Sequence, residues 1–315
     1  GSLVRGSSGS VAVLVLGSVI TFAGLGAGNV LLPPLVKKYF PDRIGLVTSI
    51  YATMLSFSTL VPPLLAVPVA DSAGWRVSLG MWAVLALIAI VPWATMLVRR
   101  RTSAEPTPVI DEAEPALLGK IWKSSIAWAI TIVFAISAVN AYAMFAWLPR
   151  LLIQTAGVSA AEAGTMLSLY AAMGIPAAIF IPVLAARMKN VAVLVYFGVA
   201  SFVVGYSGLI LFPTVGTWFW VMAAGVGPLL FPLALVLINV RTRTHAGSVA
   251  LSAFIQSIGY VVGAFGPLVV GVLHEATGGW LWPLLFLMIT ALVAIIAGTV
   301  IGRPHLLEDD LATRR

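Results

Sequence analysis

Long apolar segments separated by short polar connections dominate the chain. Nine of them are long enough to cross a bilayer as helices, since about 20 apolar residues span a hydrocarbon core of roughly 30 Å. They cover residues 11–35, 45–69, 76–98, 124–149, 163–186, 191–212, 216–240, 248–273 and 281–301. The segments are continuously apolar and do not alternate with a period of two, unlike the strands of a membrane β-barrel. The pattern therefore predicts an all-α polytopic membrane protein.

The composition supports this prediction and narrows the chemistry. Hydrophobic residues make up 60% of the 315 positions and charged residues 9%, whereas an ordinary soluble domain has about 25% charged residues. The chain has no cysteine, so disulfides, thiolate nucleophiles and cysteine-ligated metals need no consideration. The sequence also contains no nucleotide-binding motif and no constellation of metal ligands or nucleophiles. We therefore expect no enzymatic activity, no cofactor and no bound metal.

The basic residues are distributed unevenly between the two sides of the membrane. When successive connections are assigned to alternate sides, 15 of the 18 lysines and arginines fall on one side. Only Arg5, Arg76 and Arg150 fall on the other. Such an excess is the positive-inside pattern of multi-pass proteins. We therefore predict a protein of the cell inner membrane with a cytoplasmic C-terminus, and we interpret the net charge of +7 as topology and not as a nucleic-acid surface.

One polar segment divides the chain. Residues 99–123 begin with three arginines, continue with prolines and acidic residues, and cannot build a hydrophobic core. We interpret them as a cytoplasmic linker. It joins residues 1–98, the remainder of an N-terminal helical bundle, to residues 124–302, a C-terminal six-helix bundle. Residues 303–315 are expected to form a cytoplasmic tail.

A weak internal repeat relates the two bundles. The segments 24–75 and 225–280 each contain a Gly-x-Gly pair, a later proline, a basic turn, an acidic residue and a Gly-Trp pair. Repeats of this kind are typical of transporter folds. Three apolar segments of the second bundle precede the second copy, but only ten residues precede the first apolar segment of the first copy. We therefore expect three further spans upstream; the alternative is a natural nine-span protein behind a Gly/Ser-rich linker.

The apolar segment 248–273 has two neighbouring faces of different character. One face has small residues at a spacing of four, which allow a neighbouring helix to approach closely. These residues are Gly259, Gly263, Pro267 and Gly271. The other face has polar residues at the same spacing, namely Ser248, Ser252, Gln256 and Tyr260. Because lipid cannot satisfy serine and glutamine side chains, this face is expected to contact protein or water.

Six polar side chains within the predicted spans are the candidate substrate-binding residues. They are Asn29, Tyr51, Asn140, Tyr142, Gln256 and Tyr260. We expect the last four to lie on the wall of a central, water-accessible cavity. The alternative is that they are ties between helices, which contribute about 0.6 kcal/mol on average in membrane proteins.

His274 and Glu275 stand side by side at the end of one predicted span. A histidine next to a carboxylate can serve as a general base, but no second histidine, nucleophile or ligand set accompanies this pair in the sequence. We interpret the pair as part of a solvated turn.

Several signatures resemble one family of transporters. They are Gly26-x-Gly28-Asn29 leading to Pro33 and Lys37, Ala146-Trp147-Leu148-Pro149, Phe231-Pro232-Leu233, Gln256-Ser-Ile-Gly259-Tyr260 before Gly266-Pro267, and Thr277-Gly278-Gly279-Trp280. With two helical halves and a basic linker, they resemble the major facilitator superfamily and, more narrowly, its cyanate transporter family, which also includes 2-nitroimidazole exporters. The resemblance covers residues 11–302.

The resemblance implies a major facilitator fold in which the nine spans correspond to the fourth to twelfth of twelve helices. It also implies a monomeric, gradient-driven secondary transporter that moves a small solute by alternating access. The solute would be a cyanate-like anion or a nitroimidazole-like compound, and the other partner would be the lipid bilayer. Because function changes easily on one scaffold, a non-transporting membrane fragment or scaffold from a degenerate transporter gene is the alternative.

Overall fold

The computed structural model describes residues 1–102, 119–303 and 305–312. Within these residues, nine helices are long and apolar enough to cross a membrane, and each overlaps one of the nine predicted segments. The predicted all-α polytopic fold is therefore confirmed. Most of the linker predicted over 99–123, and the last three residues of the predicted tail, lie outside the described residues.

The chain forms two compact units. The first contains Gly1–Asn29 and Pro62–Asp111, and the second contains Val30–Val61 and Glu112–Arg315. The second unit thus includes, besides the six-helix bundle, the end of one predicted N-terminal span and most of the next. The domain boundaries predicted at 98 and 124 do not coincide with this division, and they stay predictions.

The first unit is built from α1 (Ser2–Gly6), α4 (Trp75–Gly80), α5 (Ala83–Thr102) and parts of α2 (Val11–Tyr39) and α3 (Ile44–Ala73), which are joined by η1 (Pro41–Arg43). α1 packs on α4, where a Cβ on Gly6 would lie 2.9 Å from the Cα of Gly80. Arg76 Nε donates to the Ser8 carbonyl at 3.1 Å. Most described side chains of α5 are exposed.

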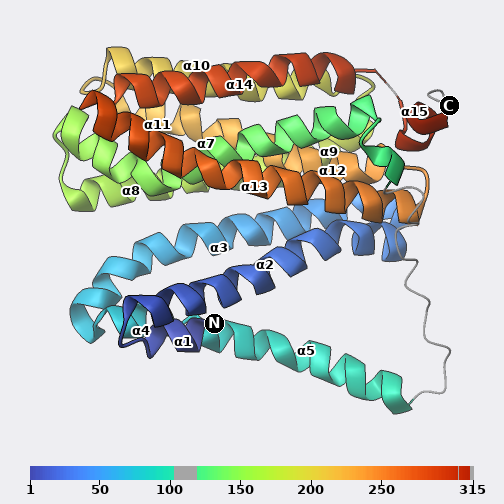
Figure 1. Cartoon of the computed structure of the whole chain (residues 1–315), viewed down its shortest axis with the longest axis horizontal. Helices are drawn as coiled ribbons and strands as arrows, with labels where there is room; N and C mark the ends of the chain where they lie inside the picture. Colours follow the sequence, from blue (N-terminus) through green and yellow to red (C-terminus); the bar gives the residue numbers. More distant parts are fainter. Residues whose placement is uncertain (103–118, 304, 313–315) are drawn as a thin grey trace. The chain divides into compact units, whose positions relative to one another are not determined.

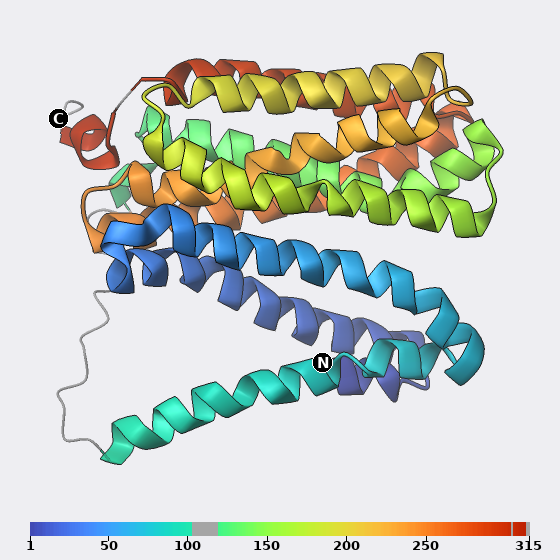
Figure 2. The same ribbon diagram turned by 180° about the vertical axis from the view of Figure 1, so that it is seen from behind.

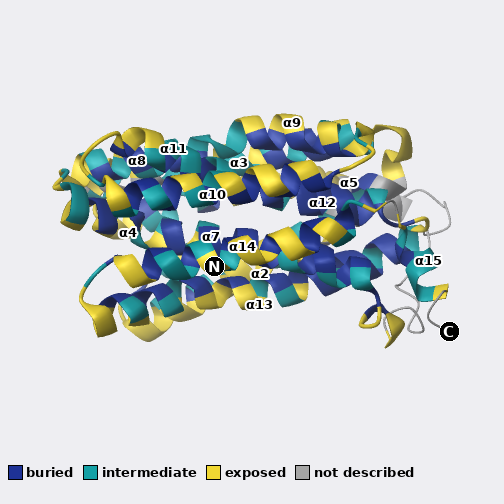
Figure 3. Ribbon diagram, turned by 90° about the horizontal axis from the view of Figure 1, so that it is seen from above, coloured by how far each residue is buried: buried dark blue, intermediate teal, exposed yellow. Residues whose placement is uncertain are grey.

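The second unit contains a bundle of long helices and two broken spans (Figures 1 and 2). Its elements are α7 (Ser125–Ala156), α8 (Ala160–Ala172), α9 (Gly174–Arg187), α10 (Ala192–Leu211), α11 (Thr217–Val226), η2 (Gly227–Leu229), α12 (Leu230–Val240), α13 (His245–Thr277), α14 (Leu281–Ile301) and α15 (Leu307–Ala312). α7 packs most extensively against α13 and α14. Buried positions dominate α7 and α12, whereas exposed positions recur along α14 (Figure 3).

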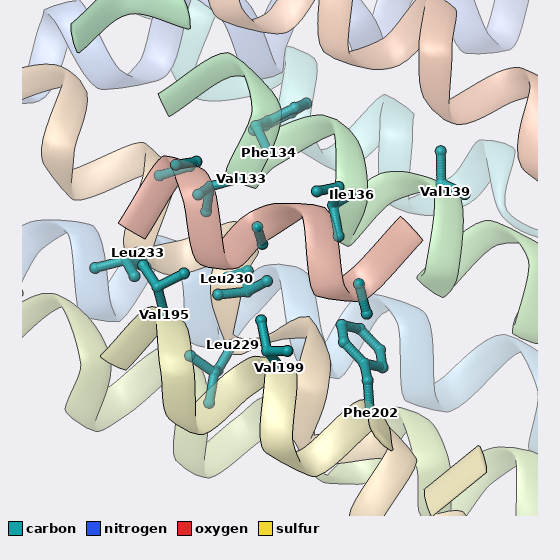
Figure 4. Packing of buried hydrophobic residues seen from close by; sticks show 14 of the residues in the cluster. Val133, Phe134, Ile136, Val139, Val195, Val199, Phe202, Leu229, Leu230 and Leu233 are labelled. Atoms are coloured by element: carbon teal, nitrogen blue, oxygen red, sulfur yellow. The ribbon is translucent and has the colours of Figure 1, made fainter. Parts of the chain in front are cut away.

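The bundle core lies where α7, α10 and the η2–α12 segment meet (Figure 4). Val133 and Phe134 of α7, Phe202 of α10 and Leu230 of α12 are among its fully buried side chains. A Cβ on Gly198 would lie 2.9 Å from Leu230 Cδ2, so this glycine lets α10 approach α12 closely. Close packing of this kind is the main source of helix association within a membrane.

Proline and glycine explain why two spans are broken. Pro228 has no N–H to donate to the preceding turn, and the chain follows a 3₁₀ turn over Gly227–Leu229 between α11 and α12. Between α8 and α9 the helix is interrupted at Met173, shortly before Pro176. The irregular backbone thus falls inside two predicted spans and not between them.

The ends of the long helices follow from capping residues. Ser124 accepts from Ala127 N at the start of α7, and Thr244 accepts from Gly247 N at the start of α13. Gly157 and Gly278 end the same two helices in the left-handed conformation that glycine adopts without strain. The two helices that carry four of the six candidate residues therefore have well-defined boundaries.

Candidate functional site

Three of the four residues of the polar face of α13 are completely buried. Ser248 Oγ donates to Asn239 Oδ1 of α12 at 2.8 Å, and Gln256 Nε2 donates to Ser252 Oγ at 2.9 Å. Ser248, Ser252 and Gln256 are all 0% exposed. Gln256 Oε1 has no hydrogen-bond partner among the described residues. A buried acceptor without a partner is costly, so this oxygen is available to a donor brought by a ligand or by water.

The small-residue face of α13 packs closely on a neighbouring helix, as predicted, and that helix is α7. A Cβ on Gly263 would lie 2.7 Å from Ala138 Cβ, and one on Gly266 would lie 2.6 Å from the Val139 carbonyl oxygen. A Cβ on Gly259 would overlap the ring of Phe134. Because helix backbone cannot retreat from such overlaps, the glycines set the spacing of α7 and α13. This expectation is confirmed.

Three aromatic rings meet one turn along α13 from Gln256. The Phe134 ring lies edge-on to Tyr260, with centroids 5.1 Å apart, and 5.3 Å from Phe231 of α12. Tyr260 is half-buried, and Phe134 is fully buried. Gln256, whose amide oxygen has no partner among the described residues, thus stands one helical turn along α13 from Tyr260 of this cluster, and an amide acceptor and aromatic rings are groups that can hold a small planar molecule by hydrogen bonding and stacking. The sequence prediction did not include Phe134, whose apolar character gives no local signal.

Asn140 lies in a hydrogen-bond network inside the bundle. Its Nδ2 donates to the Ile136 carbonyl at 2.9 Å and to Thr290 Oγ1 of α14 at 3.2 Å. Its Oδ1 accepts from the Tyr206 hydroxyl of α10 at 2.9 Å. Asn140 is 0% exposed, as is Gln256, which differs from the water-accessible wall expected from the sequence. The physical reason is that Asn140 ties α7 to α10 and α14.

The remaining candidates lie in different surroundings. Tyr142 is 39% exposed, and its ring edge would lie 3.4 Å from a Cβ on Gly263. Tyr51 belongs to the part of α3 in the second unit, and its hydroxyl, like that of Thr48 one turn earlier, is buried without a partner among the described residues. Asn29 belongs to the first unit. The described hydrogen bonds thus do not join the six candidates into one network.

The interpretation of His274 as a solvated residue is wrong. Its side chain is 9% exposed, and its ring stacks on Trp280 with a centroid separation of 4.0 Å. Its Nδ1 lies 3.1 Å from the Gly279 carbonyl oxygen, and Trp280 Nε1 donates to Gln154 of α7 at 2.7 Å. The turn between α13 and α14 folds back, so the aromatic residue after it covers the histidine. Glu275 alone is exposed, as expected.

The described residues hold no cluster of three or more histidine, aspartate or glutamate side chains that could bind a metal ion. One shallow hollow lies in the first unit between α1 and α4, lined by Leu3, Arg76 and Val77 among others. It contains none of the six candidate residues. The case for a substrate site therefore depends on the polar and aromatic side chains of the second unit.

Comparison with known proteins identifies the family. Residues 2–264 match the Major Facilitator Superfamily. The chain belongs to this superfamily. It is 32% identical over 308 residues to an uncharacterized transporter, YycB, of Bacillus subtilis (strain 168), covering 96% of this chain and 74% of the relative. It is 30% identical over 294 residues to a 2-nitroimidazole transporter of Escherichia coli (strain K12), covering 91% and 72%.

The resemblance stated from the sequence is thereby confirmed. The cyanate transport protein CynX of Escherichia coli (strain K12) is 26% identical over 302 residues, covering 94% of this chain and 76% of that protein. A crystal structure of a bacterial homologue of the iron transporter ferroportin, in an outward-facing state, matches with a TM-score of 0.69. The match covers 95% of this chain and 76% of that one, and at 16% identity it shows the fold alone. This major facilitator protein is thus a multi-pass membrane protein whose relatives are transporters and not enzymes.

Proposed function

We propose that this major facilitator protein is a gradient-driven secondary transporter of a small solute. Transport is supported by membership of the superfamily and by relatives described as transporters, of whose length this chain covers about three-quarters. In proteins of this architecture, one helical bundle rocks against another around a central site. The protein acts as a monomer in the inner membrane, with its C-terminus in the cytoplasm and the lipid bilayer as a further partner.

The observation that carries a substrate site is the Gln256 Oε1 atom, buried without a partner among the described residues, one helical turn along α13 from Tyr260 of the aromatic cluster with Phe134 and Phe231. An amide oxygen recognises an N–H or O–H donor, and its lack of charge fits selectivity and not charge compensation. Tyr260 and Tyr142, which are not fully buried, supply further contacts, as does Tyr51, whose hydroxyl has no partner in the part of the chain that the structure describes. Asn29 stays a candidate contact from the sequence prediction, and Asn140 positions the helices of the second unit around the site.

This chemistry fits a compact solute that has a flat face and an N–H or O–H donor. The names of two relatives state that one transports 2-nitroimidazole and the other cyanate. We propose a nitroimidazole-like azole or a cyanate-like anion as the substrate class. The azole ring offers both a stacking face and a donor, which match the aromatic cluster and the Gln256 oxygen.

Uptake into proteoliposomes tests the proposal. The protein, expressed from its natural gene and purified, is reconstituted with and without a proton gradient, and the accumulation of labelled 2-nitroimidazole and of cyanate is followed. Saturable, gradient-dependent accumulation of one of them is the expected result. Binding without transport, or no response to any small azole or anion in a folded preparation, would favour the non-transporting scaffold.

A further inference from the structure

The short helix α15, which follows the last span, docks on the connection between α12 and α13. Its first residue, Leu307, is fully buried, and its N–H donates to the Arg241 carbonyl at 2.8 Å. Arg241 is itself buried and donates through Nη2 to the Ile301 carbonyl at the end of α14, also at 2.8 Å. These contacts therefore fix the position of α15 at one end of the bundle (Figure 1).

Glu308 closes the start of α13. Its carboxylate accepts from Arg243 N at 2.9 Å, and from Thr244 N at 3.0 Å and Thr244 Oγ1 at 3.1 Å. A Cβ on Gly247 would lie 2.5 Å from Glu308 Oε1, so the glycine leaves room for the carboxylate. A negative charge at this end of a helix also interacts favourably with the helix dipole.

Asp310 closes the start of α7 in the same way. Its Oδ2 accepts from Ser124 Oγ and from Ser125 N, both at 2.7 Å, and from Ile126 N at 3.3 Å. The first N–H groups of a helix have no partner within the helix, and here the carboxylate satisfies them. Two acids of one short helix thus bind the starts of two long helices that are distant in sequence.

Asp309, between these two acids, makes a different kind of contact. It pairs with Arg243 Nη2 at 3.1 Å, and the two side chains are 48% and 62% exposed. Exposed pairs of this kind contribute little to stability because water and salt screen them. Asp309 therefore provides a control with the same charge on the same helix.

We propose that α15 is a clasp, formed by Glu308 and Asp310, that holds the starts of α7 and α13 together as one unit. α7 and α13 also contact each other through the glycines of α13, and the clasp fixes the one end where both helices begin. The clasp goes beyond the proposed transport function and does not depend on the identity of the substrate. A clasp differs from two separate caps in being cooperative, since loss of either carboxylate frees α15 and exposes both helix starts.

Amide hydrogen exchange of the full chain in detergent micelles tests this cooperativity. Glu308→Ala is expected to accelerate exchange about tenfold at the start of α13, which Glu308 contacts, and also at the start of α7. Asp310→Ala is expected to accelerate exchange by a similar factor at the start of α7, which Asp310 contacts, and also at the start of α13. Asp309→Ala is expected to leave both regions unchanged. Acceleration confined to the helix that each acid contacts would overturn the clasp in favour of independent caps, as would equal effects of all three variants.

A cross-link provides a second test that does not depend on the stability of an alanine variant. Ser124→Cys and Asp310→Cys together introduce the only two thiols of this cysteine-free chain. Oxidation is expected to form an intramolecular disulfide and to keep the start of α13 protected, because Glu308 is held in place, whereas reduction of the same variant is expected to expose the starts of both α7 and α13. Failure to cross-link, or exposure of the start of α13 that is the same in the oxidised and reduced forms, would contradict the proposal.

Discussion

Two carboxamide side chains in the middle of adjacent helices, Asn140 of α7 and Gln256 of α13, have opposite surroundings. Both are fully buried. The Asn140 amide contacts α10 and α14 through Tyr206 and Thr290, and both its nitrogen and its oxygen are used. Gln256 donates to Ser252 of its own helix, and its oxygen has no partner in the part of the chain that the structure describes.

This difference separates a tie between helices from a candidate binding group. Within a membrane, a satisfied amide can link helices without contacting any solute. An unsatisfied buried acceptor has no such structural explanation and raises the energy of the folded state until a donor reaches it. Asn140 and Gln256 carry the same amide group and lie in segments of similar sequence pattern, but their surroundings support two different roles.

The largest expected effect follows from Asn140→Leu. The substitution leaves the fully buried Tyr206 hydroxyl without its acceptor, and an orphaned buried group costs about 1–3 kcal/mol. Thr290 is affected less, because its hydroxyl also donates to the Leu287 carbonyl at 2.7 Å. We expect the free energy of unfolding, measured by denaturant titration in micelles, to fall by about this amount.

Tyr206→Phe is the matched control for this effect. It removes the orphaned hydroxyl, so the double variant Asn140→Leu/Tyr206→Phe is expected to be less destabilised than the sum of the single variants. If Asn140→Leu instead keeps its stability and loses substrate binding, Asn140 contacts the substrate, and its role does not differ from that of Gln256.

The sequence predicted the parts of the structure that depend on local pattern. The spans followed from continuous apolar runs, and the close approach of a neighbouring helix to α13 followed from the spacing of Gly259 and Gly263, although the spacing did not identify that helix as α7. The partners of Asn140 did not follow, because Tyr206 and Thr290 lie 66 and 150 positions away in the chain.

Two further features were hidden for the same reason. His274 is buried by Trp280, which stands beyond a turn, and the acids of α15 bind helix starts far away in sequence. In the sequence alone, a charged tail and a histidine at a span end both have the pattern of solvated surface. Where the local sequence pattern was misleading, tertiary contacts determined which side chains are buried and which groups they bind.

A smaller effect, on affinity and not on stability, is expected for Gln256→Leu. Loss of the amide oxygen removes one hydrogen bond to the solute worth about 0.5–1.5 kcal/mol, which corresponds to a roughly two- to twelve-fold weaker apparent affinity. Stability changes little, because Ser252 is the only described partner that is lost. Uptake kinetics and unfolding titrations of the same preparation measure the two quantities.

Gln256→Glu sharpens this test, because it keeps the shape and an acceptor oxygen but allows a charge. An anionic solute would bind Gln256→Glu less well than the parent, whereas a neutral azole donor would be tolerated. If Gln256→Leu instead leaves affinity intact and lowers the amount of folded protein, Gln256 is a tie like Asn140, and the comparison between the two amides disappears.

The smallest expected effect concerns acid and the starts of the same two helices. Burial alone would raise the pKa of Glu308 and Asp310, but hydrogen bonds from Thr244 and Arg243 to Glu308, and from Ser124, Ile126 and Ser125 to Asp310, hold both pKa values below their ordinary range. A carboxyl group whose pKa is lower in the folded than in the unfolded state stabilises the fold fully above its unfolded pKa. We therefore expect this stabilisation to begin to decline as the pH falls below about 4.5, the ordinary pKa of a glutamate, and to be lost as the pH falls through the lower folded pKa values.

Thermal melting as a function of pH measures this loss. The other charged or titratable side chains on the contacting elements are Arg241, Arg243, His245 and Asp309. The parent and Asp309→Ala are expected to lose melting temperature on acidification to a similar extent, and Glu308→Ala/Asp310→Ala to lose less, because its clasp is already absent. A double variant as acid-sensitive as the parent would show that other carboxyl groups set the acid response. In that case the starts of α7 and α13 would not be held by charge, and the link between the two helices would depend on the glycine contact alone.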